Sequence, residues 1–205
     1  MLHIQTVEPN TLELLKKLMS ESWLNDFRLV GGTSLSLQIG HRISVDLDFF
    51  TNSDFDVDNL LELLLENNYK IQIIHRANST LILNIDGTKV DFIKFRYNFL
   101  SPMITIEKIR MAPIQDIACL KIDAIAGRGA MKDFYDLYFI LQHFTLKEVL
   151  DWYSEMYKHQ TLFHILKSLT YFEDAEDNAL PIIFDEKISW ALVKQQIAVH
   201  VKTII

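Results

Sequence analysis

The sequence predicts an α+β protein, in which a small mixed β-sheet with flanking helices is followed by a helical C-terminal part. Strand-like and helix-like patterns both occur in residues 1–111, whereas residues 112–205 show only helical patterns. Hydrophobic residues make up 49% of the 205 residues, which favours a sizeable core over disorder. We therefore expect an α/β core at 1–111 and a helical part at 112–205 packed on it.

The N-terminal segment predicts a helix that leads into a strand. Residues 10–13, Asn-Thr-Leu-Glu, are typical of a capping box, and apolar residues at helical spacing continue to about Trp23. Residues 29–30 form a short apolar run that ends at the glycine pair 31–32. A short helix is expected after the glycines, because apolar residues alternate with small or polar ones up to residue 39.

A basic turn, residues 40–42, precedes a second strand that carries Asp46 and Asp48. Side chains two apart on a strand point to the same face, roughly 7 Å apart. The two carboxylates are therefore expected to aim together, while Leu47 and Phe49 point to the opposite face and into the core.

The rest of the core predicts one helix and several strands. The helix is expected at residues 57–66 and ends at the asparagine pair 67–68, since asparagine tolerates the left-handed conformation. Asp86-Gly87 predicts a two-residue hairpin turn. Strand-like runs occupy residues 70–76, 80–85 and 88–95, with a further short one at 104–106.

The helical part starts near Pro113, which suits the first turn of a helix. Gly127-Arg128-Gly129 should end that helix, and Lys132 opens the next. Asp133 and Asp136 share a face of this second helix, because they are three residues apart. Later helical runs, around 146–158, 160–169 and 186–201, carry no chemical motif and look like packing or a partner surface.

Residues 28–51 have the chemistry needed to handle a metal-bound triphosphate. Two convergent carboxylates, Asp46 and Asp48, suit Mg²⁺, a hard cation that is usually shared with substrate phosphates. Alone, such a pair is more often a solvated strand edge, and a glycine pair is more often a turn. Together they form a far more specific pattern.

The glycines and the residues after them suit a phosphate. Gly31 and Gly32 let the backbone approach a ligand closely. The helix that follows offers free N–H groups and a positive dipole end. Thr33 and Ser34 add hydroxyl donors, and they also suit a helix N-terminus.

Asp91 lies among apolar residues of the strand at 88–95, where a carboxylate is unfavourable if it is buried without a partner. One interpretation is a sheet-edge carboxylate that pairs with Lys89 or Lys94. The other is a functional carboxylate beside the Asp46–Asp48 pair.

This pattern resembles the AbiEii/AbiGii-type nucleotidyltransferases of the DNA polymerase β-like superfamily. The matching residues are Gly31-Gly32-Thr33-Ser34, then Arg42, then Ser44-Val45-Asp46-Leu47-Asp48-Phe49. Lys121 and Lys132-Asp133-x-x-Asp136 also match, although arginine is common where Lys132 stands. The resemblance covers about residues 28–142.

The resemblance implies a nucleotidyltransferase-like fold and the transfer of a nucleotide from an NTP, with Mg²⁺, or alternatively Mn²⁺, as cofactor. It implies that Asp46, Asp48 and Asp91 bind metal, and that Asp91 can deprotonate the attacking hydroxyl. Asp133 or Asp136 would organise the site or activate the acceptor. The phosphates would be held by Gly31, Gly32, Thr33 and Ser34, and their charge would be offset by Arg42 and Lys121.

The biological role that the resemblance implies is that of a toxin in a toxin–antitoxin or phage-defence system. The acceptor would be an RNA such as tRNA, or a protein, and a cognate antitoxin would be a partner. Three alternatives stay open: an NTP-binding protein without transfer, a phosphotransferase, and a scaffold that binds a partner through its C-terminal helices.

Charge and composition bear on the ligands, the disulfides and the cellular location expected for this protein. The net charge is −7, yet residues 89–132 carry a net +4, which suits a triphosphate or an RNA backbone as well as a solvated face. The lone cysteine, Cys119, permits no intrachain disulfide and is expected in the core. We see no signal peptide and no apolar run of membrane-spanning length, so a cytoplasmic protein without a membrane partner is expected.

Overall fold

A seven-stranded mixed sheet forms the centre of the computed structural model, which describes residues 1–158 and 160–204. The spatial order of the strands is β3-β4-β5-β2-β1-β7-β6. β2 runs parallel to β5 and antiparallel to β1, while β1 runs parallel to β7. The strands are β1 (Arg28–Val30), β2 (Leu47–Thr51), β3 (Ile71–Ala77), β4 (Thr80–Ile85), β5 (Thr88–Lys94), β6 (Ile104–Ile106) and β7 (Ile109–Met111).

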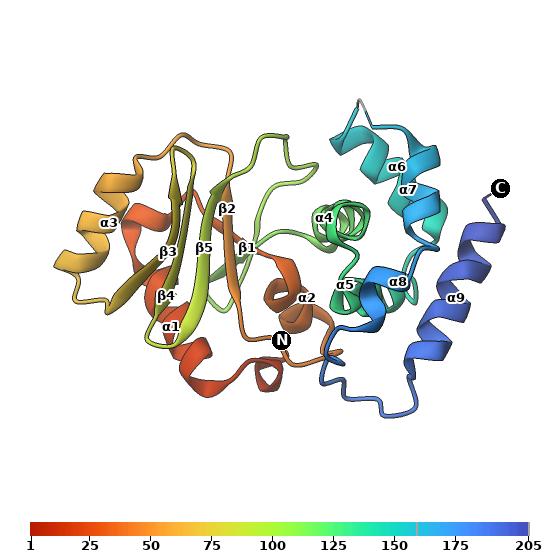
Figure 1. Ribbon diagram of the computed structural model, residues 1–205. Helices are drawn as coiled ribbons and strands as arrows, with labels where there is room; N and C mark the ends of the chain where they lie inside the picture. Colours follow the sequence, from red (N-terminus) through yellow and green to blue (C-terminus); the bar gives the residue numbers. More distant parts are fainter. Residues whose placement is uncertain (159, 205) are drawn as a thin grey trace.

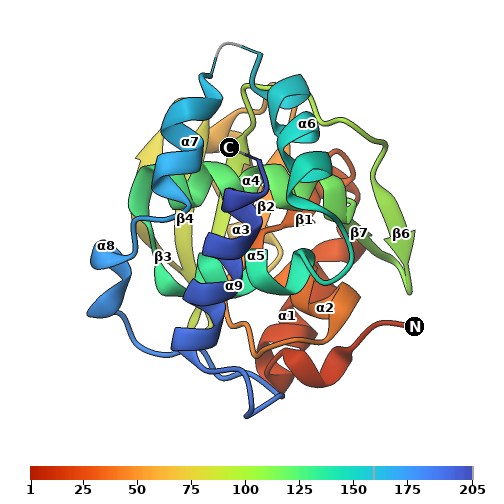
Figure 2. The same cartoon turned by 90° about the vertical axis from the view of Figure 1, so that its right-hand side faces the viewer.

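Helices cover both faces of the sheet (Figure 1). α1 (Pro9–Ser20) and α3 (Val57–Glu66) lie on one face, and α2 (Gly31–Ile39) lies on the other with α4 (Ile114–Arg128) and α5 (Met131–Ile140). Viewed from the helical side, the C-terminal helices lie in front of the sheet (Figure 2). They are α6 (Leu146–Met156), α7 (Leu162–Ser168), α8 (Glu173–Glu176) and α9 (Trp190–Lys202).

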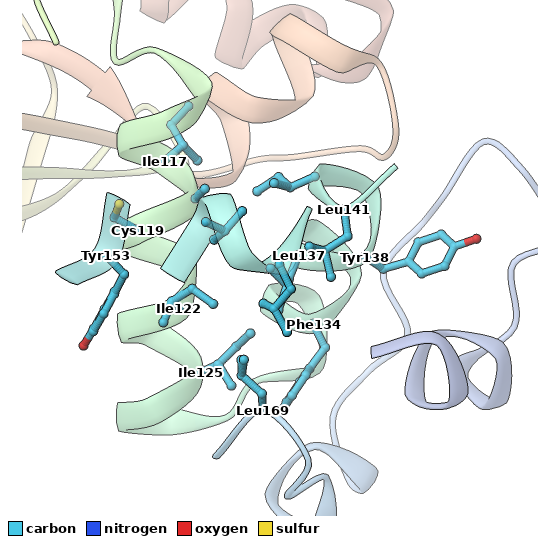
Figure 3. Close-up of a cluster of buried hydrophobic side chains, with 14 of the residues drawn as sticks. Ile117, Cys119, Ile122, Ile125, Phe134, Leu137, Tyr138, Leu141, Tyr153 and Leu169 are labelled. Carbon is cyan, nitrogen blue, oxygen red and sulfur yellow. The ribbon is translucent and has the colours of Figure 1, made fainter. Parts of the chain in front are cut away.

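Two hydrophobic clusters stabilise these layers. One lies under α1 and α3, and it includes Leu47 and Phe49, which point away from Asp48 as their alternation predicts. The other is centred on α4 and α5, which contribute Ile122 and Phe134 (Figure 3). Cys119 is buried in this second cluster, and burial raises the pKa of its thiol, so it behaves as a core residue. The division of the chain at residue 111 stays a prediction.

Several elements differ from the expectation. α1 begins at Pro9 with Glu8 as its N-cap, and neither Asn10 nor Thr11 caps it, because proline already occupies the first helical position. β7 and α8 were not expected. β6 and β7 are joined by Glu107 and Lys108, which both have positive φ although neither is a usual turn residue. By contrast, Asp86 and Gly87 form the expected hairpin, both with positive φ.

No helix in the described residues combines the length and the apolar character needed to cross a bilayer.

Candidate active site

Three neighbouring strands bring the glycine motif and two aspartates together. In the sheet register Asp48 of β2 lies opposite Asp91 of β5 on one side and Val30 of β1 on the other. Adjacent strands are about 4.8 Å apart, so the two carboxylates leave the same face of the sheet side by side. Asp91 is buried, and β5 is an inner strand, so it is not a sheet-edge carboxylate.

The glycine pair lets α2 start directly against this site. Gly31 has a φ of +67°, and a Cβ built there would lie 2.2 Å from Oδ2 of Asp48. A Cβ on Gly32 would lie 2.2 Å from Nη2 of Arg42. A side chain at Gly31 would displace the carboxylate of Asp48, and one at Gly32 would displace the guanidinium of Arg42.

We expect Gly31→Ala to disturb the site directly. The substitution forces a side chain into a left-handed conformation and into the carboxylate of Asp48, and should lower the free energy of unfolding by about 1–3 kcal/mol. Urea denaturation measures this change. Gly127→Ala is the matched control, because Gly127 lies within α4 with open space around its Cβ position. Equal stability of the Gly31→Ala protein and the wild type would contradict the close approach.

Asp46 lies just outside the strand that was expected to carry it. β2 begins one residue later, at Leu47, and the Asp46 carboxylate lies 3.5 Å from Nζ of Lys132. Asp46 lines a cavity of about 290 Å³, which is separate from the cavity that Asp48 lines. The carbonyl oxygen of Asp46 accepts a hydrogen bond from the Thr33 hydroxyl, and the Asp46 charge contributes to the raised pKa of Asp48. The expectation that the two carboxylates act together stays a prediction.

The hydroxyl groups expected at a phosphate are turned inward. Thr33 and Ser34 are both fully buried. The Thr33 hydroxyl also donates to Oγ of Ser44 at 2.9 Å, and Oγ of Ser34 accepts from Nε2 of Gln38 at 3.1 Å. Their side chains therefore position the loop before β2 and the end of α2. Their role toward a phosphate stays a prediction that rests on the backbone N–H groups of the first helical turn.

A cavity of about 490 Å³ opens on the Asp48 side of the sheet. It is lined by motif residues, by basic side chains and by an aromatic wall: Gly31, Asp48 and Lys121; Lys94, Arg96 and Arg128; Phe95, Tyr97 and Tyr157. A larger surface hollow, about 640 Å³, lies near Asp56 and Arg76 and contains none of the motif residues. The volume and the positive lining of the first cavity suit an anionic ligand of nucleotide size.

Arg42, Lys121, Asp133 and Asp136 form one buried ion-pair network. Arg42 binds Asp136 through two parallel hydrogen bonds, Nε to Oδ1 at 2.6 Å and Nη2 to Oδ2 at 2.9 Å. Nζ of Lys121 lies 2.6 Å from Oδ2 of Asp136 and 2.8 Å from Oδ1 of Asp133. The network joins the strand region to α4 and α5, across 94 residues between Arg42 and Asp136.

Arg42 and Lys121, the two network members expected to bind phosphate, are both already paired. The guanidinium of Arg42 donates to Asp136 and to the Ile43 carbonyl, and Arg42 is not among the residues that line the Asp48 cavity. Lys121 lines that cavity while its ammonium is paired with both aspartates. The role of the two residues toward a phosphate stays a prediction.

The network also includes residues that sequence reasoning did not single out. Nε2 of His41 lies 2.7 Å from Oδ1 of Asp136, and burial lowers the pKa of His41, which favours a neutral imidazole that donates this hydrogen bond. Arg128 donates to Asp133 through Nε and Nη2 at 2.9 and 3.1 Å, a paired contact that lysine cannot make. Arg128 and Asp133 are only five residues apart in the chain, and this short separation could have predicted their ion pair.

The pKa values follow from these contacts. Burial alone would raise the pKa of Asp136, but Lys121 and Arg42 hold it well below its usual range. Asp48 behaves in the opposite way, since burial and the nearby Asp91 carboxylate raise its pKa to about 6. The protein thus keeps one aspartate firmly ionised and holds another in an environment that disfavours its charge.

Asp48→Asn is expected to stabilise the metal-free protein in a pH-dependent way. The folded-state pKa of Asp48 lies above its unfolded value of 3.8, so its contribution to stability is present at low pH and is lost as the pH rises through about 6. The asparagine variant avoids this loss. Its free energy of unfolding should exceed that of the wild type by a margin that grows to about 2–3 kcal/mol as the pH rises from about 4 to about 7. Urea denaturation with a chelator present measures it, and a difference independent of pH would contradict the burial of this charge.

The carboxylates fit a hard divalent cation. Asp48 and Asp91 offer only oxygen atoms, they lie side by side, and the missing side chain at Gly31 keeps the space beside Oδ2 of Asp48 clear of a Cβ. Within the described residues, however, no three acidic, histidine or cysteine side chains are already gathered as a metal site. In place of a metal ion, the ammonium of Lys89 pairs with the Asp91 carboxylate, and the ammonium of Lys132 lies near the Asp46 carboxylate.

Several known proteins are similar to this chain. An uncharacterised protein of Aquifex aeolicus (strain VF5), aq_aa25, is 38% identical over 173 residues, which cover 80% of this chain and 82% of that protein. The crystal structure of JHP933 from Helicobacter pylori has a TM-score of 0.56 at 19% identity and covers 97% and 93% of the two chains. MenT4, a nucleotidyltransferase toxin from Mycobacterium tuberculosis H37Rv, has a TM-score of 0.57 at 15% identity and covers 87% and 76%.

The two structural likenesses show a shared fold, which is the nucleotidyltransferase fold expected from the motif. The family model described as "Nucleotidyl transferase AbiEii toxin, Type IV TA system" matches residues 13–198, nearly the whole chain. The chain therefore belongs to the AbiEii family of nucleotidyl transferase toxins of type IV toxin–antitoxin systems.

Proposed function

We propose that this protein transfers a nucleoside monophosphate from an NTP to a hydroxyl group of an RNA, such as tRNA, or of a protein, in a reaction that depends on Mg²⁺ or Mn²⁺. The observation that carries the proposal is the placement of Asp48 and Asp91 side by side on β2 and β5, against Gly31 and beside a basic cavity. Membership of the nucleotidyl transferase family supports it.

The carboxylates of Asp46, Asp48 and Asp91 would hold the divalent cation. When bound, such a cation neutralises the triphosphate and makes the α-phosphorus easier to attack. Asp46 requires a change, because its carboxylate must leave the neighbourhood of Lys132 and turn toward Asp48.

The chain's own residues would hold the nucleotide in the 490 Å³ cavity. The start of α2 offers backbone N–H groups to the phosphates, and the N-cap, Val30, makes no competing side-chain cap. Lys121 and Arg128 line the same cavity and offset negative charge. The aromatic wall, which includes Tyr97 and Tyr157, offers ring faces to the nucleobase.

The reaction would proceed by in-line displacement. The acceptor hydroxyl oxygen forms a bond to the α-phosphorus, the bond from that phosphorus to the β-phosphate oxygen breaks, and pyrophosphate leaves. The proton of the hydroxyl passes to Asp91, which lies next to the carboxylate of Asp48. Asp133 and Asp136 would act indirectly, since both are buried and hold Lys121 in place.

The proposed role is that of a toxin whose activity is opposed by a cognate antitoxin, as the family description suggests, with phage defence as a setting. NTP binding without transfer and phosphoryl transfer are the alternatives. Both would use the same cavity, so they must be separated by the product.

The test incubates purified protein with Mg²⁺, cellular RNA and protein, and each of the four NTPs labelled at the α-phosphate. We expect one nucleotide to label one class of macromolecule, and we expect the label to disappear in Asp48→Asn. Nucleotide binding without any labelled macromolecule would favour the alternatives and contradict the proposal.

A further inference from the structure

Lys89 is a half-exposed lysine that contacts a carboxylate of the site. It precedes Asp91 by two residues on β5, so both side chains leave the same face of the sheet. Its Nζ lies 2.5 Å from Oδ1 and 2.6 Å from Oδ2 of Asp91 and so bridges both carboxylate oxygens. In the metal-free protein the Lys89 ammonium therefore occupies the position where a metal ion bound by both Asp91 oxygens would lie.

The need for such a charge follows from the register. Asp48 and Asp91 are direct neighbours on parallel strands, and two like charges at this distance repel each other. Because the Asp91 carboxylate is only 11% exposed, water screens that repulsion poorly. The ammonium of Lys89 compensates it without a metal.

Lys89 is also free to leave, which distinguishes it from the other lysine of the site. The Lys89 side chain is 41% exposed, so its ammonium can turn into water on a flexible stem. The Lys121 side chain is only 5% exposed and is held between Asp133 and Asp136. Moving Lys121 would take a buried cation away from two fully buried carboxylates, whereas moving Lys89 exposes one carboxylate to an arriving cation.

We propose that Lys89 is a resident counter-cation that competes with the divalent metal for Asp91, and that its ammonium moves into solvent when the metal binds. Lys89 then sets the metal concentration at which the site fills, and it withholds Asp91 as a proton acceptor until that point. This inference rests on the proposed function, since it takes Asp48 and Asp91 as metal ligands.

The direct test measures Mn²⁺ binding to the nucleotide-free protein by the electron paramagnetic resonance signal of the free ion. Lys89→Gln removes the competing charge, and we expect it to lower the dissociation constant for Mn²⁺ about tenfold. Lys89→Met is a second neutral variant in case the glutamine variant fails to fold. Lys89→Arg keeps the charge and should bind Mn²⁺ no more tightly than the wild type.

Lys147→Gln is the matched control, because it removes the same charge from an exposed lysine–aspartate pair on α6, that of Lys147 and Asp151. It should leave Mn²⁺ binding unchanged. Asp91→Asn supplies the second control: if Lys89 competes through Asp91, Lys89→Gln should have no effect on Mn²⁺ affinity in an Asp91→Asn background.

The outcomes separate the two proposals. Wild-type protein that binds Mn²⁺ as tightly as Lys89→Gln and Lys89→Met would overturn the role of Lys89 and leave the metal site intact. An effect of Lys89→Gln that persists with Asp91→Asn would overturn competition at Asp91. An absence of Mn²⁺ binding in the wild type and in every folded variant would contradict the metal-dependent function itself, and the Lys89 role with it.

Discussion

Asp136→Asn is expected to lower the free energy of unfolding by about 3–5 kcal/mol, the range measured when one partner of a buried ion pair is removed. Asp136 is fully buried and accepts hydrogen bonds from Arg42 and His41, while Lys121 lies 2.6 Å from it. Without the negative charge of Asp136, the Arg42 guanidinium and the Lys121 ammonium would stay buried with too little negative charge to balance them. Urea denaturation at neutral pH measures the loss.

Asp151→Asn provides the control for this prediction. Asp151 pairs with Lys147 on the surface of α6, where both side chains are largely exposed, so its loss should change stability by less than about 0.5 kcal/mol. Equal stabilities of the two variants would mean that the Arg42–Asp136–Lys121 network contributes little to the fold.

Asp48→Asn is expected to reduce nucleotidyl transfer by about a thousandfold or more, because it removes a group on which the reacting centre depends. The same variant should be more stable than the wild type near neutral pH, since Asp48 is held with its pKa raised to about 6. The loss of activity therefore cannot come from unfolding. Transfer is measured as initial rates of label incorporation.

Asp86→Asn is the matched control, because Asp86 is exposed in the β4–β5 turn and asparagine also tolerates its positive φ. It should retain the wild-type rate. Activity of Asp48→Asn within about tenfold of the wild type would contradict a central role for this carboxylate.

Local turn chemistry explains why much of the fold could be predicted from the sequence. Asn68, Asp86 and Gly87 adopt the positive φ values that their residue types favour, and α3, β4 and β5 lie where they were expected. The β6–β7 hairpin was missed for the same reason, because Glu107 and Lys108 carry no such preference yet both have positive φ.

The site was harder to predict because its partners are distant in the chain. The motif named Arg42, Lys121 and Asp136, but basic residues near a triphosphate motif suggest phosphate contacts, and nothing local reveals that they pair with one another. That pairing depends on α4 and α5 packing against α2. Likewise, Asp46 fits a strand pattern, yet it lies just before β2, where its carbonyl oxygen accepts a hydrogen bond from Thr33, a contact that the sequence does not reveal.

The central claim, nucleotidyl transfer at Asp48, is tested most directly by using one NTP labelled at either the α- or the γ-phosphate with the acceptor fraction. Transfer of the α-label to the macromolecule, with the γ-label recovered in pyrophosphate and neither product formed by Asp48→Asn, is the result we predict. Transfer of the γ-label to the macromolecule would show phosphoryl transfer instead and would contradict the claim.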